Sequence, residues 1–301
     1  MAASLLKSHG GELAALVTAL CWTVTAMAFE YASKRVGSLP VNLLRLLLAF
    51  LFLSAYSAVF RGMPLPLDAA PRAWFWLFLS GLVGFVIGDL LLFRAFVLIG
   101  SRVSMLIMAL APPLAALLGW LFMDERLSTL DGAGMALTLG GIGMVIMGRN
   151  REGGVSLSYS PAGILCALGG AFGQAGGLVL SKYGMGGYSP FSATQIRVIA
   201  GIAGFTALFF VLGAWPRIGE ALKNRAALGT LTLGAFFGPF LGVSFSLAAV
   251  QRTGVGVAST IMSLVPVFII APAAVLFRER VTSREVLGAV IAVAGTAMLF
   301  L

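Results

Sequence analysis

Charged residues are scarce in this sequence. Lysine, arginine, aspartate and glutamate together make up 10% of its 301 residues, whereas 59% of the residues are hydrophobic. A soluble domain carries about 25% charged residues because its surface faces water, so a soluble globular domain is excluded. The apolar residues also lack the two-residue alternation of outer-membrane barrel strands. Their long blocks predict an all-α integral membrane protein, since the backbone must satisfy its own hydrogen bonds in lipid.

Cysteine and histidine are almost absent as well. Cys21 and Cys166 are the only cysteines, and His9 is the only histidine. We therefore expect no disulfide framework, no metal site and no cofactor. The spans also lack the convergent nucleophile, base or metal ligands of an enzyme, so we expect no catalytic residue. A Gly-x-x-x-x-Gly-Lys-Ser/Thr loop is missing too, which excludes a P-loop ATPase.

The net charge of +9 does not point to nucleic acid. Most Lys and Arg residues lie in short joints between apolar blocks, such as Lys34-Arg35 and Lys223/Arg225. This distribution is typical of contact with lipid headgroups and of topology signals. We expect the lipid bilayer as a partner, and no nucleic acid.

A span needs about 20 apolar residues, and the joints divide the chain into ten such blocks. We predict spans at 12–33, 40–60, 73–98, 102–123, 131–148, 161–183, 190–214, 227–250, 256–277 and 284–301. The longest polar segment, Arg149 to Ser160, lies at the middle of the chain. We therefore divide the chain into two five-helix domains, 1–150 and 151–301.

The two halves repeat each other. A shift of 154 residues aligns 84–147 with 238–301 without a gap. Pro112 then matches Pro266, and the identical glycine pairs include Gly84/Gly238 and Gly88/Gly242. Because five is odd, the second copy crosses the membrane in the opposite direction. Two inverted five-helix repeats are the architecture of many secondary transporters, in which the substrate binds near the midplane between the repeats.

Several of these residues carry a family resemblance. The segments Asp124-Glu125-Arg126-Leu127-Ser128 and Arg278-Glu279-Arg280-Val281-Thr282 each follow a proline-containing span and precede a short glycine-rich one. Together with Trp22 and the Pro40-to-Arg45 and Pro190-to-Arg197 starts of the second and seventh spans, this pattern resembles the EamA-type drug/metabolite transporter (DMT) superfamily. The bacterial YddG-type exporters of aromatic and other amino acids are the most similar members.

The resemblance implies a secondary transporter in the bacterial inner (cytoplasmic) membrane. We expect it to export small metabolites, above all aromatic and other apolar amino acids, by alternating access with the substrate between the repeats. We expect it to function as a monomer. The alternatives are export of other metabolites or drugs, a passive channel, and a membrane-embedded enzyme. The region Leu20-Cys21-Trp22-Thr23 lacks the acid of the small multidrug relatives, which argues against cationic drugs.

Two arguments disagree on the orientation. The odd-numbered joints carry eleven Lys and Arg residues, whereas the termini and the even-numbered joints carry six. The positive-inside rule then puts both termini outside the cell. The family resemblance implies cytoplasmic termini, and we follow the family.

Ionisable residues inside a span are functional candidates, because burying a charge in lipid is costly. Glu30 and Arg45 lie at a similar shallow depth on one side of the membrane, and Arg94 reaches the same side. We expect these three to form a gate or ion-pair network; the alternative is a static cluster that orients helices. Asp89 lies deeper, and we assign it to substrate binding. Arg197 is expected near the opposite face in a structural role.

Further substrate contacts are predicted from residue type and depth. Trp22 lies in the middle of the first span, and Gln174 has a comparable place in the inverted half. Met108 and Met262 offer an adaptable apolar wall. The alternative for each of them is simple packing.

Glycines and prolines in the spans are assigned to the scaffold. Gly84, Gly88, Gly238 and Gly242 form two G-x-x-x-G pairs that permit close helix packing. Pro112 and Pro266 fall at equivalent points of the repeats, and we expect each of them to break its helix near a central site.

Overall fold

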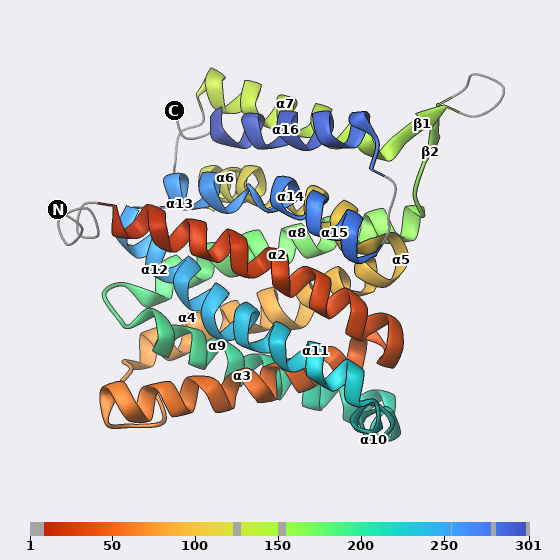
Figure 1. Ribbon diagram of the computed structural model, residues 1–301. Coiled ribbons are helices and arrows are strands. Elements are labelled where there is room, and N and C mark those ends of the chain that lie inside the picture. Colours follow the sequence, from red (N-terminus) through yellow and green to blue (C-terminus); the bar gives the residue numbers. More distant parts are fainter. Residues whose placement is uncertain (1–8, 123–127, 150–154, 254, 278–280, 299–301) are drawn as a thin grey trace.

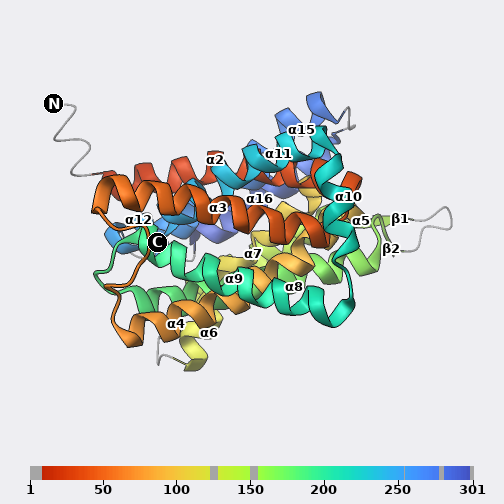
Figure 2. The ribbon, with the colours of Figure 1, turned by 90° about the horizontal axis from the view of Figure 1, so that it is seen from below.

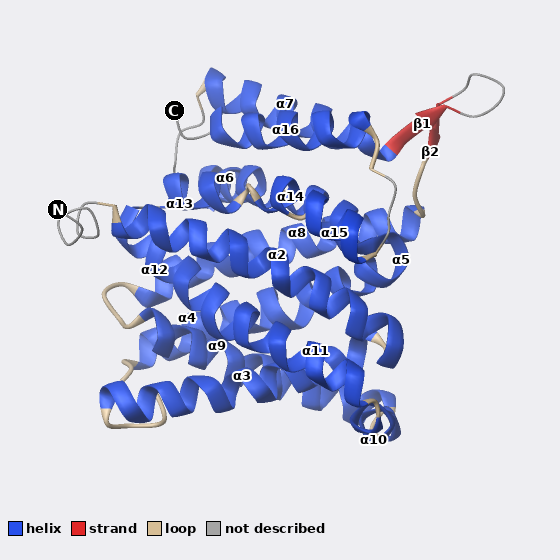
Figure 3. Cartoon of the chain, in the orientation of Figure 1, coloured by secondary structure: helices blue, strands red, loops and turns tan. Residues whose placement is uncertain are grey.

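The computed structural model describes residues 9–122, 128–149, 155–253, 255–277 and 281–298, and within them the chain is almost entirely helical (Figure 3). The long helices run side by side along one common direction (Figure 1). A short antiparallel hairpin, β1 (Met147–Arg149) and β2 (Val155–Leu157), occupies the polar segment between the two halves. The predicted domain boundary at residues 150 and 151 lies outside the described residues.

Helices occupy every predicted span. The first half contains α2 (Gly10–Val36), α3 (Ser38–Arg61), α4 (Pro71–Gly81), η1 (Leu82–Gly88), α5 (Asp89–Met108), α6 (Ala111–Phe122) and α7 (Thr129–Ile146). The second half contains α8 (Pro161–Met185), α9 (Pro190–Leu212), α10 (Pro216–Lys223), α11 (Arg225–Ala235), η2 (Phe236–Gly242), α12 (Val243–Thr253), α13 (Val255–Met262), α14 (Val265–Phe268), α15 (Ile270–Leu276) and α16 (Ser283–Met298).

Eight helical stretches of the described chain are long and apolar enough to cross a membrane. One of them, Pro71–Met108, covers the third predicted span and the beginning of the fourth. The tenth predicted span contains α16, of which 16 residues are described. The number of ten spans therefore stays a prediction.

A short helix that the sequence analysis did not predict connects α9 and α11. This helix, α10, begins at Pro216 and crosses the direction of the long helices (Figures 1 and 2). Ala221 is buried against the long helices, whereas Arg217 and Lys223 are exposed.

The repeat is visible in an unusual backbone feature. The π-helical segments η1 and η2 begin and end 154 residues apart, at the shift that the sequence alignment requires. Each continues an α-helix on both sides: η1 joins α4 to the part of α5 that precedes Gly100, and η2 joins α11 to α12. π-Helical insertions loosen the regular backbone ladder and occur frequently at functional sites.

The expected helix breaks also occur in pairs. Helical structure stops at residues 109–110 and at 263–264, directly before Pro112 and Pro266. A proline cannot donate a backbone hydrogen bond and clashes with the preceding turn. Thr296 Oγ1 donates to the carbonyl of Ala109 at 3.4 Å, which satisfies one of the backbone groups at the first break.

The third and fourth spans meet at a kink rather than at a loop. Gly100 has φ 78° and ψ 162°, a conformation that glycine adopts readily. The kink removes the next residue, Ser101, from the regular hydrogen-bond ladder. The Ser101 backbone N–H donates instead to Glu30 Oε2 at 2.7 Å.

The last helices of the two halves, α7 and α16, pack against each other along a seam of small residues (Figure 1). A side chain on Gly141 would meet the carbonyl of Gly288 at 2.6 Å, and one on Gly295 would meet the carbonyl of Gly134 at 2.6 Å. These are the same contact seen from each half, because Gly134 repeats as Gly288 and Gly141 repeats as Gly295. The seam therefore has approximate two-fold symmetry.

The two G-x-x-x-G pairs meet different partners. Gly84 and Gly88 approach the backbone of Gly173 and Gly177 in α8, so helices touch closely there. Gly238 and Gly242 instead face large side chains of α2. The two halves are thus packed tightly at one of these contacts and are held apart by side chains at the other.

Candidate functional site

A cavity of about 120 Å³ lies between the two halves. Its wall takes residues from α2, α3, η1, α5 and α6 of the first half and from α8, η2, α12, α13 and α14 of the second. The helix breaks before Pro112 and Pro266 both border it. Trp22, Thr25 and Phe29, the side chains of α2 that face Gly238 and Gly242, all lie on its wall.

All five residues that we assigned to substrate binding lie on the wall of this one cavity. They are Trp22, Asp89, Met108, Gln174 and Met262. A side chain at Gly242 would meet the indole Nε1 of Trp22 at 2.9 Å. The absence of a side chain at Gly242 therefore makes room for the indole ring. The structure brings these residues together, and their role in binding stays a prediction.

Most of the wall is apolar. Phe93 stacks on Phe96 with ring centroids 5.3 Å apart, and Phe29 lies 4.9 Å from Phe93. Met105 and Met108 extend this surface. Aromatic rings and flexible thioethers suit an apolar or aromatic guest.

One ion pair interrupts the apolar wall. Arg45 Nη2 donates to Asp89 Oδ2 at 2.6 Å, and the two side chains are only 4% and 13% exposed. Asn42 supports both partners: its Oδ1 accepts from Arg45 Nε at 3.3 Å, and its Nδ2 donates to the Asp89 carbonyl at 3.3 Å. The guanidinium also lies 4.6 Å from the ring centroid of Phe93. A pair held in this way is fixed in position.

The predicted network of Glu30, Arg45 and Arg94 is not formed. Glu30 pairs with Lys34 and accepts from the Ser101 N–H, and Arg45 pairs with Asp89. Arg94 is exposed, and no hydrogen bond or ion pair joins it to these groups within the described part of the chain. The prediction rested on depth alone. Arg94 follows Asp89 by five residues, which turns it about 140° around the helix to another face.

Arg197 is also placed differently from our expectation. It is 3% exposed and lies in the interior of the helix bundle rather than near headgroups. Its guanidinium is 4.9 Å from the ring centroid of Phe85, a residue of the cavity wall, and its charge acts on Asp89. Its Nε is buried and has no hydrogen-bond partner in the described residues. The sequence did contain a signal for this residue: the second and seventh spans both begin with a proline that an arginine follows, Arg45 after Pro40 and Arg197 after Pro190.

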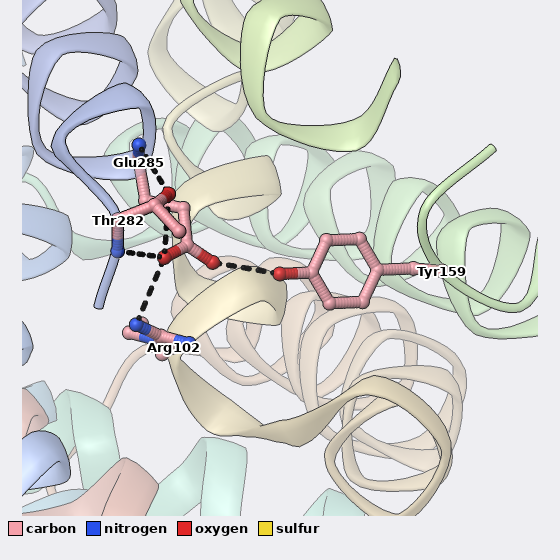
Figure 4. A network of polar contacts seen from close by, with 4 residues as sticks. All are labelled: Arg102, Tyr159, Thr282 and Glu285. Atoms are coloured by element: carbon pink, nitrogen blue, oxygen red, sulfur yellow. Dashed lines mark hydrogen bonds and ion pairs between the residues drawn. The ribbon is translucent and has the colours of Figure 1, made fainter. Parts of the chain in front are cut away.

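Figure 4 shows a polar cluster that the sequence analysis missed, formed by Arg102, Tyr159, Thr282 and Glu285. Glu285 Oε2 accepts from Arg102 at 3.2 Å, and Glu285 Oε1 accepts from the Tyr159 hydroxyl at 2.8 Å. Glu285 also accepts from the Thr282 backbone N–H at 2.9 Å, which caps the beginning of α16. The cluster joins α5 of the first half to the second half.

A second polar cluster lies at the other end of the bundle. Arg61 at the end of α3 donates to Asp68 and to Ser192, and the Tyr188 hydroxyl donates to Asp68 at 2.8 Å. Gln195 Nε2 donates to the carbonyl of Pro64 at 2.7 Å. Polar contacts therefore join the two halves at both ends of the bundle.

The remaining sequence assignments concern motifs and metals. Glu125, Arg126, Glu279 and Arg280, which contribute to the family resemblance, lie outside the described residues. In the part of the chain that the structure describes, no group of three or more His, Cys, Asp and Glu residues is arranged to hold a metal ion.

Comparison with known proteins agrees with the internal repeat. The family model described as the EamA-like transporter family matches the chain twice, over residues 9–147 and 161–301. One solved structure, titled "Crystal structure of protein", is 18% identical, covers 96% of this chain and 96% of its own, and superposes with a TM-score of 0.56. At this identity the likeness shows the fold alone. No curated protein matches the chain.

Proposed function

Because the chain belongs to the EamA-like transporter family, with two copies of the family domain, and is therefore an integral membrane protein that transports small molecules, we propose that it exports amino acids with aromatic or other apolar side chains. In this proposal it is a secondary transporter of the bacterial inner membrane, similar to the YddG-type exporters of the DMT superfamily. It works by alternating access, with the substrate between the repeats.

The observation that carries the proposal is the chemistry of the central cavity. Rings of Trp22, Phe29, Phe93 and Phe96 and three methionine side chains line it, with one ion pair at its edge. A pocket with apolar walls and a few polar groups is suited to a small amphipathic molecule. An aromatic amino acid has this character, with a ring at one end and charged groups at the other.

The same cavity argues against cationic drugs. Asp89 is the only acidic side chain on the described wall, and Arg45 already neutralises it. A permanently cationic guest would therefore find no free carboxylate. Export of uncharged metabolites is the alternative that this wall leaves open.

The symmetry of the molecule supports alternating access. Both halves contribute to the cavity, and polar contacts join the halves at each end of the bundle. Rocking of one inverted repeat against the other exchanges the open and closed ends. One copy of the chain supplies both repeats, so the proposal needs no second protomer.

The test is counterflow in reconstituted liposomes. Vesicles preloaded with an unlabelled amino-acid mixture take up labelled phenylalanine, with and without an imposed proton gradient. Trp22→Ala removes a ring from the cavity wall. The matched control is Trp120→Ala, since Trp120 of α6 is 49% exposed. Empty vesicles give the background.

We expect saturable uptake that Trp22→Ala abolishes and Trp120→Ala leaves intact. The effect of the gradient shows whether protons drive transport. Uptake that does not saturate points to a channel. If phenylalanine does not exceed the background and other amino acids fail as well, the amino-acid assignment is wrong.

A further inference from the structure

The charges around the cavity do not balance. Arg45 and Asp89 are the only charged side chains on its described wall, and they neutralise each other. Arg197 lies directly behind Phe85, which belongs to the wall, and brings a second guanidinium to the same place. Two buried cations thus face one buried carboxylate.

The internal repeat shows which group is missing. In the first half, the arginine of the second span pairs with Asp89 of the third span. In the second half, Arg197 follows Pro190 by seven residues, where Arg45 follows Pro40 by five, and Val243 follows Asp89 by the repeat distance of 154. Val243 also lies on the cavity wall. The acid that would complete the second pair is therefore replaced by an apolar residue, at a place that borders the cavity.

Arg197 shows the consequence of this replacement. It is 3% exposed, and its Nε has no hydrogen-bond partner in the described residues. An uncompensated buried charge costs several kcal/mol in general. The other buried acid, Glu30, does not relieve it, because Glu30 pairs with Lys34 and with the Ser101 N–H.

The ring of Phe85 separates Arg197 from the cavity. The Phe85 ring contacts both guanidiniums, with centroid distances of 5.5 Å to Arg45 and 4.9 Å to Arg197, so a rotation of this one side chain connects Arg197 with the cavity. Beside Arg197, a side chain on Gly84 would meet Nη2 at 3.0 Å. Since Gly84 has no side chain, the guanidinium lies directly against the backbone of η1.

We propose that Arg197, with Arg45 and Asp89 beside it, forms a subsite for the carboxylate group of the substrate, which takes the place of the acid missing at Val243. The guanidinium fork matches the two oxygens of a carboxylate. The inference rests on the proposed function and deepens it: the carboxylate, rather than the ammonium group, is the charged group that the cavity selects. Arg197 is the specificity-determining residue.

The test compares two analogues of phenylalanine, each of which keeps the ring and one of the two charged groups. The probe 3-phenylpropionate keeps the ring and the carboxylate, and phenethylamine keeps the ring and the ammonium group. Each is titrated into the purified protein while its melting temperature is followed, and each competes with labelled phenylalanine in liposome counterflow. We expect 3-phenylpropionate to act at concentrations about tenfold lower than phenethylamine, a difference of about 1.4 kcal/mol.

Substitutions of Arg197 and of Val243 test where the subsite lies. Arg197→Gln is expected to weaken 3-phenylpropionate about tenfold, and Arg197→Lys to weaken it less. Val243→Asp supplies the missing acid and is expected to abolish the preference for the carboxylate, whereas the uncharged control Val243→Asn retains most of it. Because Val243→Asp adds a partner for Arg197, it keeps the test decisive if Arg197→Gln does not fold.

The outcomes separate the inference from the proposed function. If phenethylamine binds as well as 3-phenylpropionate, or if Val243→Asp and Val243→Asn behave alike, the carboxylate subsite is wrong even where phenylalanine is transported. If phenylalanine is not transported but 3-phenylpropionate raises the melting temperature through Arg197, the subsite stands and the amino-acid assignment falls.

Discussion

Arg45 and Asp89 form a buried ion pair, with Nη2 and Oδ2 2.6 Å apart, on the wall of the central cavity. The pair joins α3 to the beginning of α5, directly after the π-helical segment η1. It therefore fixes the place where the irregular backbone returns to a regular helix.

Removing one partner of the pair destabilises the protein more than removing both. Asp89→Leu leaves the Arg45 guanidinium buried without its acid, and we expect a loss of about 3–5 kcal/mol. The double variant Arg45→Met/Asp89→Leu is expected to recover a large part of this loss. Thermal unfolding in detergent micelles measures the two single variants, Arg45→Met and Asp89→Leu, and the double variant. If the two single losses simply add in the double variant, the side chains do not depend on each other.

The seam between α7 and α16 distinguishes two neighbouring glycines. A side chain at Gly141 would meet the backbone N of Ala292 at 2.6 Å, whereas nothing lies within 4 Å of one at Gly140. We expect Gly141→Ala to cost about 1–3 kcal/mol through overpacking. Gly140→Ala is expected to be neutral or to stabilise by up to about 1 kcal/mol, because alanine favours helix. Equal melting temperatures of the two variants would contradict this packing.

The cluster around Glu285 predicts a specific cost for one hydroxyl. Tyr159→Phe removes the donor to Glu285 Oε1 at 2.8 Å and leaves the ring in place. A hydrogen bond to a charged group contributes about 1.5–3 kcal/mol, and we expect a loss of this order together with faster hydrogen exchange at the beginning of α16. The control is Tyr183→Phe, since the Tyr183 hydroxyl makes no hydrogen bond to the described residues. Unchanged exchange in Tyr159→Phe would refute the role of this contact.

The cluster at the other end predicts a dependence on pH. Hydrogen bonds from Arg61 and then from Tyr188 hold the pKa of the exposed Asp68 carboxyl below its ordinary value of 3.8. Since the folded pKa is the lower one, the stabilisation is complete above the ordinary value and is lost as the pH falls through the folded pKa. The difference in melting temperature between the wild type and Asp68→Asn should therefore be constant near neutral pH and shrink below about pH 4.

A second variant checks the cause of this pH dependence. Tyr188→Phe removes one donor, so the pH at which the difference disappears should move upward. A difference that grows on acidification would show that the Asp68 contacts do not act as described.

The positions of the helices could be predicted because lipid makes long apolar runs and breaking residues informative. The repeat distance of 154 residues came from glycines and from Pro112 and Pro266, and η1 and η2 obey it. Trp22 and Gln174 were placed by depth, and they lie on the cavity wall because mid-span polar or amphipathic groups avoid lipid.

Other features could not be read from the sequence. Depth along a span does not give the direction of a side chain around the helix, which is why Arg94 was grouped with Arg45. The π-helical segments have no composition of their own; only the second contains a proline, Pro239. Arg197 was assigned to the membrane surface because its distance from a span end was known and the packing of α9 against α3 and α4 was not.

The seam of α7 and α16 has an evolutionary meaning. Gly141 meets Gly288 and Gly134 meets Gly295, so the contact is isologous: each half presents the same surface to the other. Thr138 Oγ1 donates to the carbonyl of its own repeat counterpart, Ala292, at 3.3 Å, which places this pair on the two-fold axis. Such a contact is the one that two identical copies of a half-length ancestor, inserted in opposite directions, would make.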